Sequence, residues 1–241
     1  MYIVCAAARV TGEISSPGVG DIVGVTSVDD ELFVLLNRHK NQVAVYSIND
    51  YQLLRHLNMP GLMPFGDSDM TSCVRHKCLY MSDYNDCVRR YDLQRTLSAR
   101  MKQMVGLGSP ISKLSVPGKP RGLSVTPSCN LLVTCCEPAK LVELSADSGQ
   151  CVREIALRSD IVLPWHSVQL TTGEFVVCHG EYGRGLHQVC VVGDDNKVTR
   201  SYGGECGSDV GKLFNPRHLA VNTDSQFIFC LLYTSPSPRD S

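Results

Sequence analysis

Two histidines are the residues of this sequence whose type and placement best suit metal chemistry. His166 and His218 each stand two residues after a proline, near the start of a short apolar run. Imidazole nitrogens bind zinc, and a catalytic zinc site takes three protein ligands and keeps one open position. The matching position in a third apolar run is Gly122, and the sequence near Ser72 offers no ligand. With only two ligands in view, we expect no metal and no cofactor, and we interpret the histidines as loop residues.

A second group of residues, Cys73, His76, Cys78 and Cys87, has metal-binding side chains in an unsuitable pattern. Structural zinc sites use closely spaced cysteine pairs that are repeated at a distance along the chain. Here a single C-x₄-C pair has no second pair to complete it. Buried thiols on strands are therefore the expected arrangement.

Motifs for catalysis are otherwise missing from the sequence. The stretch from Gly207 to Leu213 matches a phosphate-binding loop only in part, because Cys206 replaces the first glycine and Leu213 replaces the serine or threonine. There is no G-x-S-x-G nucleophile elbow, and no carboxylate pair that the sequence places face to face. The sequence therefore predicts no enzyme; a metal-dependent lyase or hydrolase at the two histidines is the alternative.

The elements that must position these residues are short strands in a repeated unit. Five β-rich bursts follow small turns, with spacings of 47, 52, 44 and 52 residues between their second positions, Leu32, Leu79, Leu131, Phe175 and Phe227. Each burst is preceded by a short apolar run, and the first four are followed by another. A more polar run often closes the unit. Four short strands in a period of about 49 residues are typical of a β-propeller blade.

The predicted fold is all-β, a propeller of four-stranded antiparallel blades with about four to five blades present in residues 21–232. The fifth unit stops after its second strand. Residues 1–20 are a strand-like lead-in that could complete a ring, with Tyr2–Cys5 as a third strand and Val10–Ile14 as a fourth. The favoured expectation is an incomplete piece of a larger ring. Residues 233–241 are Ser/Pro-rich and predict a disordered tail of non-native character.

Composition bounds the class of protein. Of the 241 residues 43% are hydrophobic, and 23 basic residues balance 24 acidic ones. This balance excludes a uniformly cationic nucleic-acid binder, although a local basic face remains compatible with it. No stretch approaches the roughly 18 consecutive apolar residues of a membrane span. Many of the 12 cysteines lie in apolar runs, which predicts buried free thiols in a cytoplasmic protein that does not contact membranes.

Two stretches carry a resemblance to a known repeat. Residues Tyr202–Asn222 (YGGECGSDVGKLFNPRHLAVN) resemble the linker and first strand of an NHL repeat, and Leu79–Leu93 (LYMSDYNDCVRRYDL) resemble its second and third strands. A shorter match is Pro120–Val125 (PRGLSV), whereas Asn37–Asn41 and Cys136–Ala139 lack the Asp-x-x-Asn turn of that family. The chain is thus similar to the propeller at the C-terminus of tripartite-motif proteins. No RING or B-box cysteine pattern is present, so ligase activity is not assigned to this chain.

The resemblance implies a non-catalytic binding module, as part of a tripartite-motif-type ubiquitin ligase or a similar assembly. In propellers, the turns between second and third strands share a face with the linkers that enter first strands. Cations and aromatic residues gather there, which suits single-stranded RNA or a protein partner. We expect Arg121, Trp165 and Arg217 around one rim, with the indole as a flat stacking surface. The candidate binding residues are Arg38, His39, Lys40, Tyr84, Asn85, Arg121, Trp165, His166, Arg184, Arg217 and His218.

Overall fold

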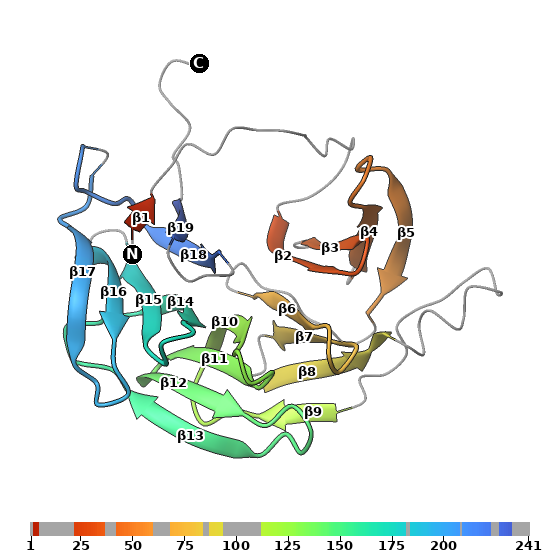
Figure 1. Cartoon of the computed structure of the whole chain (residues 1–241), viewed down its shortest axis with the longest axis horizontal. Helices are drawn as coiled ribbons and strands as arrows, with labels where there is room; N and C mark the ends of the chain where they lie inside the picture. The colour runs from red at the N-terminus through yellow and green to blue at the C-terminus, as the bar shows by residue number, and fades with distance from the viewer. Residues whose placement is uncertain are drawn as a thin grey trace.

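The protein is built from strands arranged in five sheets around a common centre (Figure 1). The computed structural model describes residues 2–4, 22–36, 42–59, 68–83, 87–93, 112–181, 184–207, 209–222 and 227–232. All the secondary-structure elements in these ranges are strands, which confirms the predicted all-β class. Over the same ranges, no helix has the length and apolar character that a membrane span requires.

Four of the sheets are blades of four antiparallel strands that follow one another along the chain. The blades are β2 (Ile22–Val28), β3 (Glu31–Leu36), β4 (Gln42–Ser47) and β5 (Leu53–Asn58) in blade 1; β6 (Met70–Cys73), β7 (Cys78–Asp83), β8 (Cys87–Asp92) and β9 (Ser112–Ser115) in blade 2; β10 (Pro120–Val125), β11 (Leu131–Cys136), β12 (Ala139–Leu144) and β13 (Cys151–Ala156) in blade 3; and β14 (Pro164–Gln169), β15 (Phe175–Glu181), β16 (Arg184–Val192) and β17 (Val198–Gly204) in blade 4. Each predicted burst forms the second strand of its sheet.

The fifth sheet, blade 5, contains β18 (Pro216–Val221), β19 (Phe227–Leu232) and β1 (Tyr2–Val4). Strand β1 pairs with β19, as a third strand would, but it runs parallel to it, whereas the third strands of the other blades are antiparallel to the second. The physical reason is that no tight turn joins β1 to β19, and only a short hairpin forces the antiparallel direction. The stretch proposed as a fourth strand, Val10–Ile14, and the tail 233–241 lie outside the described residues.

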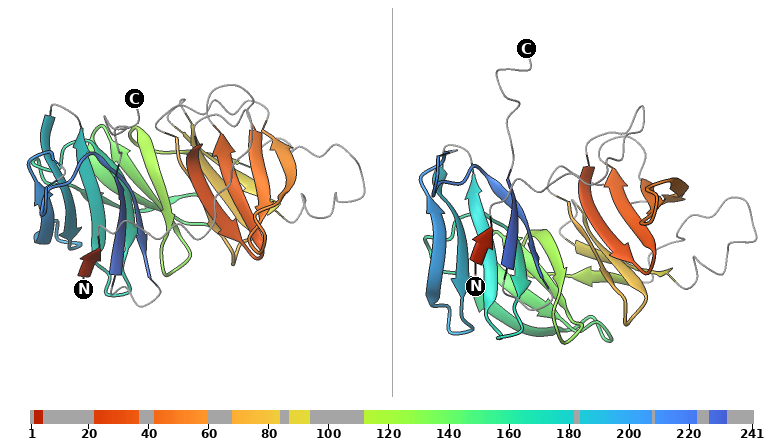
Figure 2. Two further views of the ribbon diagram at one scale, coloured as in Figure 1. Left: turned by 90° about the horizontal axis from the view of Figure 1, so that it is seen from above. Right: turned by 45° about the horizontal axis from the view of Figure 1, so that its top comes forward.

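The first strand of each blade lies nearest the centre and the fourth lies at the rim, as Figures 1 and 2 show. Neighbouring blades contact each other through these inner strands, β2 with β6, β6 with β10, β10 with β14 and β14 with β18. Burial follows the same gradient, since β11 is buried at every position while most of β13 is exposed. The apolar bursts of blades 2, 3 and 4 are therefore strands covered on both faces.

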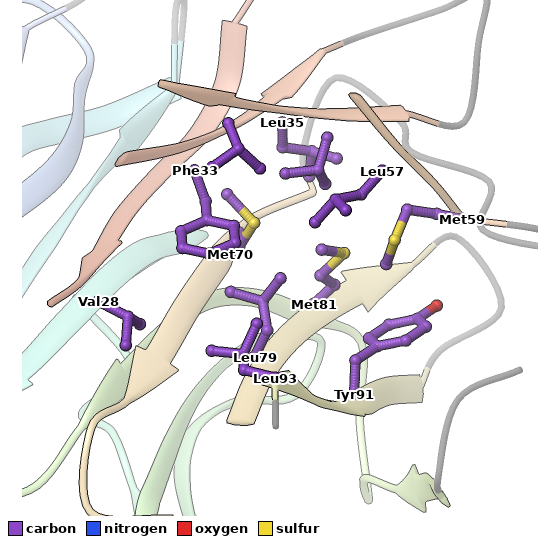
Figure 3. Packing of buried hydrophobic residues seen from close by; sticks show 12 residues of the cluster. Val28, Phe33, Leu35, Leu57, Met59, Met70, Leu79, Met81, Tyr91 and Leu93 are labelled. Carbon is purple, nitrogen blue, oxygen red and sulfur yellow. The ribbon is translucent and has the colours of Figure 1, made fainter. Parts of the chain in front are cut away.

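Apolar side chains between adjacent sheets hold the blades together. Figure 3 shows the cluster between blades 1 and 2, in which Phe33 and Leu35 from β3 lie near Met70 from β6 and Leu79 and Met81 from β7. All five side chains are buried. A single blade cannot bury these faces by itself, so each blade depends on its neighbours for stability.

The cysteines follow the prediction of buried thiols where their side chains are described. Cys151 and Cys206 are exposed and Cys129 is partly buried, while the seven others are buried, and none of these ten is in a disulfide. Burial raises the pKa of Cys135 to about 12 and that of Cys190 to about 11. These two thiols therefore stay protonated at neutral pH.

Candidate metal centre

Asp69, His166 and His218 come together where the inner strands of blades 2, 4 and 5 begin, and we call this group the Asp–His–His site. One ligand atom from each residue lies within 4.8 Å of the other two. Nε2 of His166 is 3.5 Å from Oδ2 of Asp69, and Nε2 of His218 is 3.6 Å from Oδ1. The two imidazole rings stack with 3.9 Å between their centroids. Among the described residues, this is the one group of three ligands close enough to share an ion.

A repeated irregularity of the inner strands places the two histidines. The pairing of β14 with β15 shifts between Pro164 and His166, and that of β18 with β19 shifts between Pro216 and His218. Such a bulge leaves one extra residue on a strand and re-aims the side chains beside it. The proline-to-histidine spacing seen in the sequence therefore marks a bulge at the start of an inner strand.

Asp69 holds the place in blade 2 that His166 holds in blade 4. Ser72 is the strand partner of Leu79, and Asp69 lies three residues before it. In the same way, Gln169 is the strand partner of Phe175, and His166 lies three residues before it. The sequence interpretation missed this ligand because it aligned the blades by their prolines, and none precedes Asp69 closely. The equivalence becomes visible only from the strand partners in the structure.

Blade 3 supplies main chain to the site, whereas blades 2, 4 and 5 supply the three side chains. A Cβ on Gly122 would lie 2.5 Å from the carbonyl oxygen of Trp165 and 2.6 Å from Cα of His166, so only glycine allows β10 to approach β14 this closely. The next residue, Leu123, donates its N–H to Oδ2 of Asp69 at 2.8 Å. Its carbonyl oxygen is 3.0 Å from Nε2 of His166. One residue thus holds both side chains.

Further hydrogen bonds fix the carboxylate of Asp69, which is buried. The N–H of Met70 donates to Oδ1 at 2.7 Å. The N–H of Asp69 donates to Oγ of Ser82 at 2.8 Å, and the Ser82 hydroxyl donates to the carbonyl of Arg121 at 2.9 Å. The carboxylate is therefore oriented by backbone groups of blades 2 and 3 before any ligand arrives.

Two of the three protonation states at the site, those of Asp69 and His166, suit a cation. Burial by itself would raise the pKa of Asp69, but the hydrogen bond and charge of His218, with His166 and the Leu123 amide, hold it below its ordinary value. Burial, together with the charge of His218, lowers the pKa of His166 to about 3. Burial also opposes protonation of His218, yet its bond to Asp69 raises its pKa. At neutral pH the site thus offers an ionised carboxylate and the neutral imidazole of His166.

The spacing of the donor atoms is close to the ligand spacing of a zinc site. Zinc takes nitrogen and oxygen ligands at about 2.0–2.1 Å, so two ligands of a tetrahedral site stand about 3.4 Å apart. Nε2 of His166 lies 3.5 Å from Oδ2 of Asp69 and Nε2 of His218 lies 3.6 Å from Oδ1, so each nitrogen is near this distance from a different oxygen of the carboxylate. His166 is buried, whereas the side chain of His218 is 37% exposed. The arrangement therefore has three protein ligands and one side open to solvent, as catalytic zinc sites do.

Arg121, Trp165 and Arg217 come together as expected, but the indole is covered. The guanidinium carbons of Arg121 and Arg217 lie 3.9 and 3.3 Å from the ring centre of Trp165. The indole N–H donates to the carbonyl of Gly180 at 2.9 Å, and Trp165 is only 6% exposed. The expectation of an open stacking surface is therefore wrong, because two cation–π contacts occupy the ring.

The other predicted binding residues divide into three groups. His166 is buried in the Asp–His–His site and is not part of an open surface, while His218 is partly exposed beside it. Arg184 is the first residue of β16, and its backbone lies opposite that of Glu181 in the register of β15 with β16. The remaining residues, Arg38, His39, Lys40, Tyr84 and Asn85, lie outside the described residues.

Comparison with known proteins identifies neighbours in structure and none in sequence. No protein-family model matches the chain, and no curated protein matches its sequence. The hydrazine synthase of Kuenenia stuttgartiensis is similar with a TM-score of 0.63 and 17% identity, over 91% of this chain and 57% of that one. A virginiamycin B lyase from Staphylococcus aureus has a TM-score of 0.58 and 11% identity, over 89% of this chain and 64% of that one. A streptogramin B lyase has a TM-score of 0.60 and 11% identity, over 90% of this chain and 64% of that one.

These neighbours bear on the fold and not on the activity. The chain spans between 57% and 64% of their length, at no more than 17% identity. Nothing in the comparisons supports an NHL or tripartite-motif relationship beyond the propeller class. Four antiparallel sheets of four strands, with their first strands innermost, agree with the fold of these neighbours. The chain is therefore a β-propeller, with four four-stranded blades and the three-stranded blade 5 among the described residues.

Proposed function

We propose that the Asp–His–His site binds one divalent transition-metal ion, with zinc as the best fit, and that the chain is a metal-dependent lyase or hydrolase. The observation that carries the proposal is the third ligand, Asp69, within 4.8 Å of both histidines. Two imidazoles and one carboxylate are the ligand set of a common class of catalytic zinc site. They come from three blades, so the ring itself sets their geometry.

The residues of the site have distinct parts in this proposal. The metal would supply a Lewis acid or an activated water. Asp69 would bring the negative charge that offsets the ion, held in place by Leu123 and Met70. In the structure Nε2 of His166 donates to the carbonyl of Leu123. To bind a metal through Nε2, the ring would have to move this proton to Nδ1, which is buried and has no hydrogen-bond partner among the described residues. His218, on the exposed side, would lie beside the open position that a substrate needs.

The first test is metal content. Full chain that is loaded with zinc and then dialysed should retain about one equivalent by mass spectrometry, and a chelator should remove it reversibly. Combined replacement of His166 and His218 by alanine should abolish retention. His56→Ala is the matched control, since His56 is an exposed histidine on the outer strand β5. Retention that is equal in the double variant, or absent from the unmodified chain, would exclude the metal centre.

The second test is the pH dependence of zinc affinity. A metal needs the neutral imidazole, so a proton on His218 competes with it. The pKa of His218 is raised, so the competition should begin above the ordinary histidine value of about 6.5 and weaken binding about tenfold for each pH unit below that pKa. Asp69 stays ionised in this pH range. His166 has a pKa of about 3, so no proton on it competes with the metal. Calorimetric titrations that show constant affinity from about pH 5 to 8 would contradict this assignment.

The second candidate function is the binding module that the sequence resemblance implies. The observation that favours it is the pair of cations, Arg121 and Arg217, held over Trp165. Guanidinium groups recognise the carboxylates of a protein or the phosphates of single-stranded RNA. This candidate needs no metal and suits a cytoplasmic, tripartite-motif-like assembly. A chain that retains no zinc but binds such a partner, and loses it in an Arg121→Ala, Arg217→Ala variant, would favour this candidate.

A further inference from the structure

Away from the Asp–His–His site, a thiol, an imidazole and a carboxylate form a row of contacts between blades 2 and 3. Sγ of Cys73, at the end of β6, is 3.1 Å from Nδ1 of His76 in the β6–β7 turn. Nε2 of His76 is 3.2 Å from Oδ1 of Asp147, in the β12–β13 turn. An imidazole that contacts a thiol through one nitrogen and a carboxylate through the other is placed to accept the thiol proton.

A second thiol stands opposite the first. Cys73 and Cys78 are direct partners across the β6–β7 hairpin. In the strand registers of the described residues, no other two cysteines are paired in this way. Opposite residues of an antiparallel pair have Cβ atoms about 4.5–5.5 Å apart, and a disulfide brings them to about 3.5–4.5 Å. A small movement at the end of the hairpin would therefore join the two sulfur atoms.

We propose that Cys73 and Cys78 form a redox-active dithiol that a hydroperoxide converts into an intrachain disulfide. In the first step His76 takes the proton of Cys73, the sulfur attacks the peroxide, an S–O bond forms and the O–O bond breaks. The leaving oxygen takes the proton from His76 and departs as water or an alcohol. In the second step Cys78 attacks the sulfenic sulfur, an S–S bond forms, the S–O bond breaks and water leaves. The two thiols lose two electrons, which the peroxide gains.

Burial decides the roles of the two thiols and the size of the oxidant. Cys73 is 2% exposed and Cys78 is 1% exposed, so hydrogen peroxide and other small hydroperoxides suit the site better than bulky disulfides. Burial raises the pKa of the Cys78 thiol, despite the neighbouring Tyr80 and Arg90. Cys73, which contacts His76, is therefore the thiol that reacts first, and Cys78 resolves the sulfenic acid.

The chain contains its own control for this chemistry. Sγ of Cys190 is 3.6 Å from Nε2 of His179, and both residues are buried. The strand partners of Cys190 are Val177 and Ser201, so no second thiol stands opposite it. Cys190 thus shares the thiol–imidazole contact with Cys73 and lacks the partner that would form a disulfide.

The experiment is peroxide treatment of the folded full chain, followed by alkylation, digestion and mass spectrometry. We expect a reversible Cys73–Cys78 disulfide, with Cys190 recovered as a thiol. Cys78→Ser should stop the reaction at a sulfenic acid on Cys73, which dimedone traps. His76→Ala should slow disulfide formation by about a hundredfold, in the range that a positioned general base contributes.

Three outcomes would overturn the proposal. One is alkylation of both Cys73 and Cys78 after peroxide treatment of chain that remains folded. Another is a disulfide between other cysteines at equal yield, and the third is an unchanged rate in His76→Ala. If that variant does not fold, Asp147→Asn provides the test, because this side chain is 87% exposed and its replacement leaves the core intact. It should slow oxidation several-fold, and an unchanged rate would remove the role of the row of contacts.

Discussion

Replacing Asp69 by asparagine should weaken zinc binding by at least about a hundredfold. Loss of a residue that only orients a ligand already costs about 10–100-fold in metal affinity, and Asp69 is the one proposed ligand that carries a negative charge. Asparagine keeps the shape of the side chain but not the charge that offsets the ion. Competition titration with a zinc indicator measures the effect.

The control for this substitution is Asp195→Asn. Asp195 is an exposed aspartate in the β16–β17 turn, where it pairs with Lys197. Zinc affinity should be unchanged in this variant, and both variants should give cooperative thermal unfolding. An affinity in Asp69→Asn within about threefold of the unmodified chain would show that the carboxylate is not a ligand.

Replacing Gly122 by alanine should lower the free energy of unfolding by about 2–3 kcal/mol, the upper part of the range for an overpacked site. The added Cβ would meet three atoms at 2.5, 2.6 and 2.9 Å, and the two nearest belong to the backbone of Trp165 and His166. Backbone atoms cannot swing aside, so β10 and β14 must separate. That separation would lengthen the contact of His166 with Leu123 and should weaken zinc binding as well.

Gly204→Ala is the matched control for this prediction. Gly204 ends β17, and an added Cβ there meets no atom within 4 Å. Urea unfolding should therefore give a free energy within about 0.5 kcal/mol of the unmodified chain, as for other surface substitutions. Equal free energies of unfolding for the Gly122 and Gly204 variants would show that the close approach of β10 and β14 does not contribute to stability.

The repeat could be predicted from the sequence because the second strands of blades 2, 3 and 4 are buried on both faces. Such a strand appears as a continuous apolar burst, and β7 and β11 are buried at every position. The bursts therefore mark the blades without any knowledge of the turns between them. The parallel pairing of β1 with β19 carries no comparable signal, since a short apolar strand far from its partner in sequence pairs in either direction.

The site could be predicted only in part. His166 and His218 stand out because a proline precedes each bulge, whereas Asp69 lies just before the four-residue strand β6 and has no such proline. Its equivalence to His166 depends on strand partners, which the sequence alone does not give. The burial of Trp165 was missed for a related reason. A bulge shifts the alternation of faces by one residue, so the side on which the indole lies depends on the pairing of Pro164 and His166 with β15.

The three residues of the Asp–His–His site belong to blades that are not all neighbours, since blade 3 separates the blades of Asp69 and His166. In a repeat architecture the units contact only adjacent units, so an end unit can fray while the others stay folded. An ion held by blades 2, 4 and 5 would be lost when any one of the three opened. It would therefore link their unfolding, and blade 5, which has the fewest strands among the described residues, would gain the most protection from hydrogen exchange.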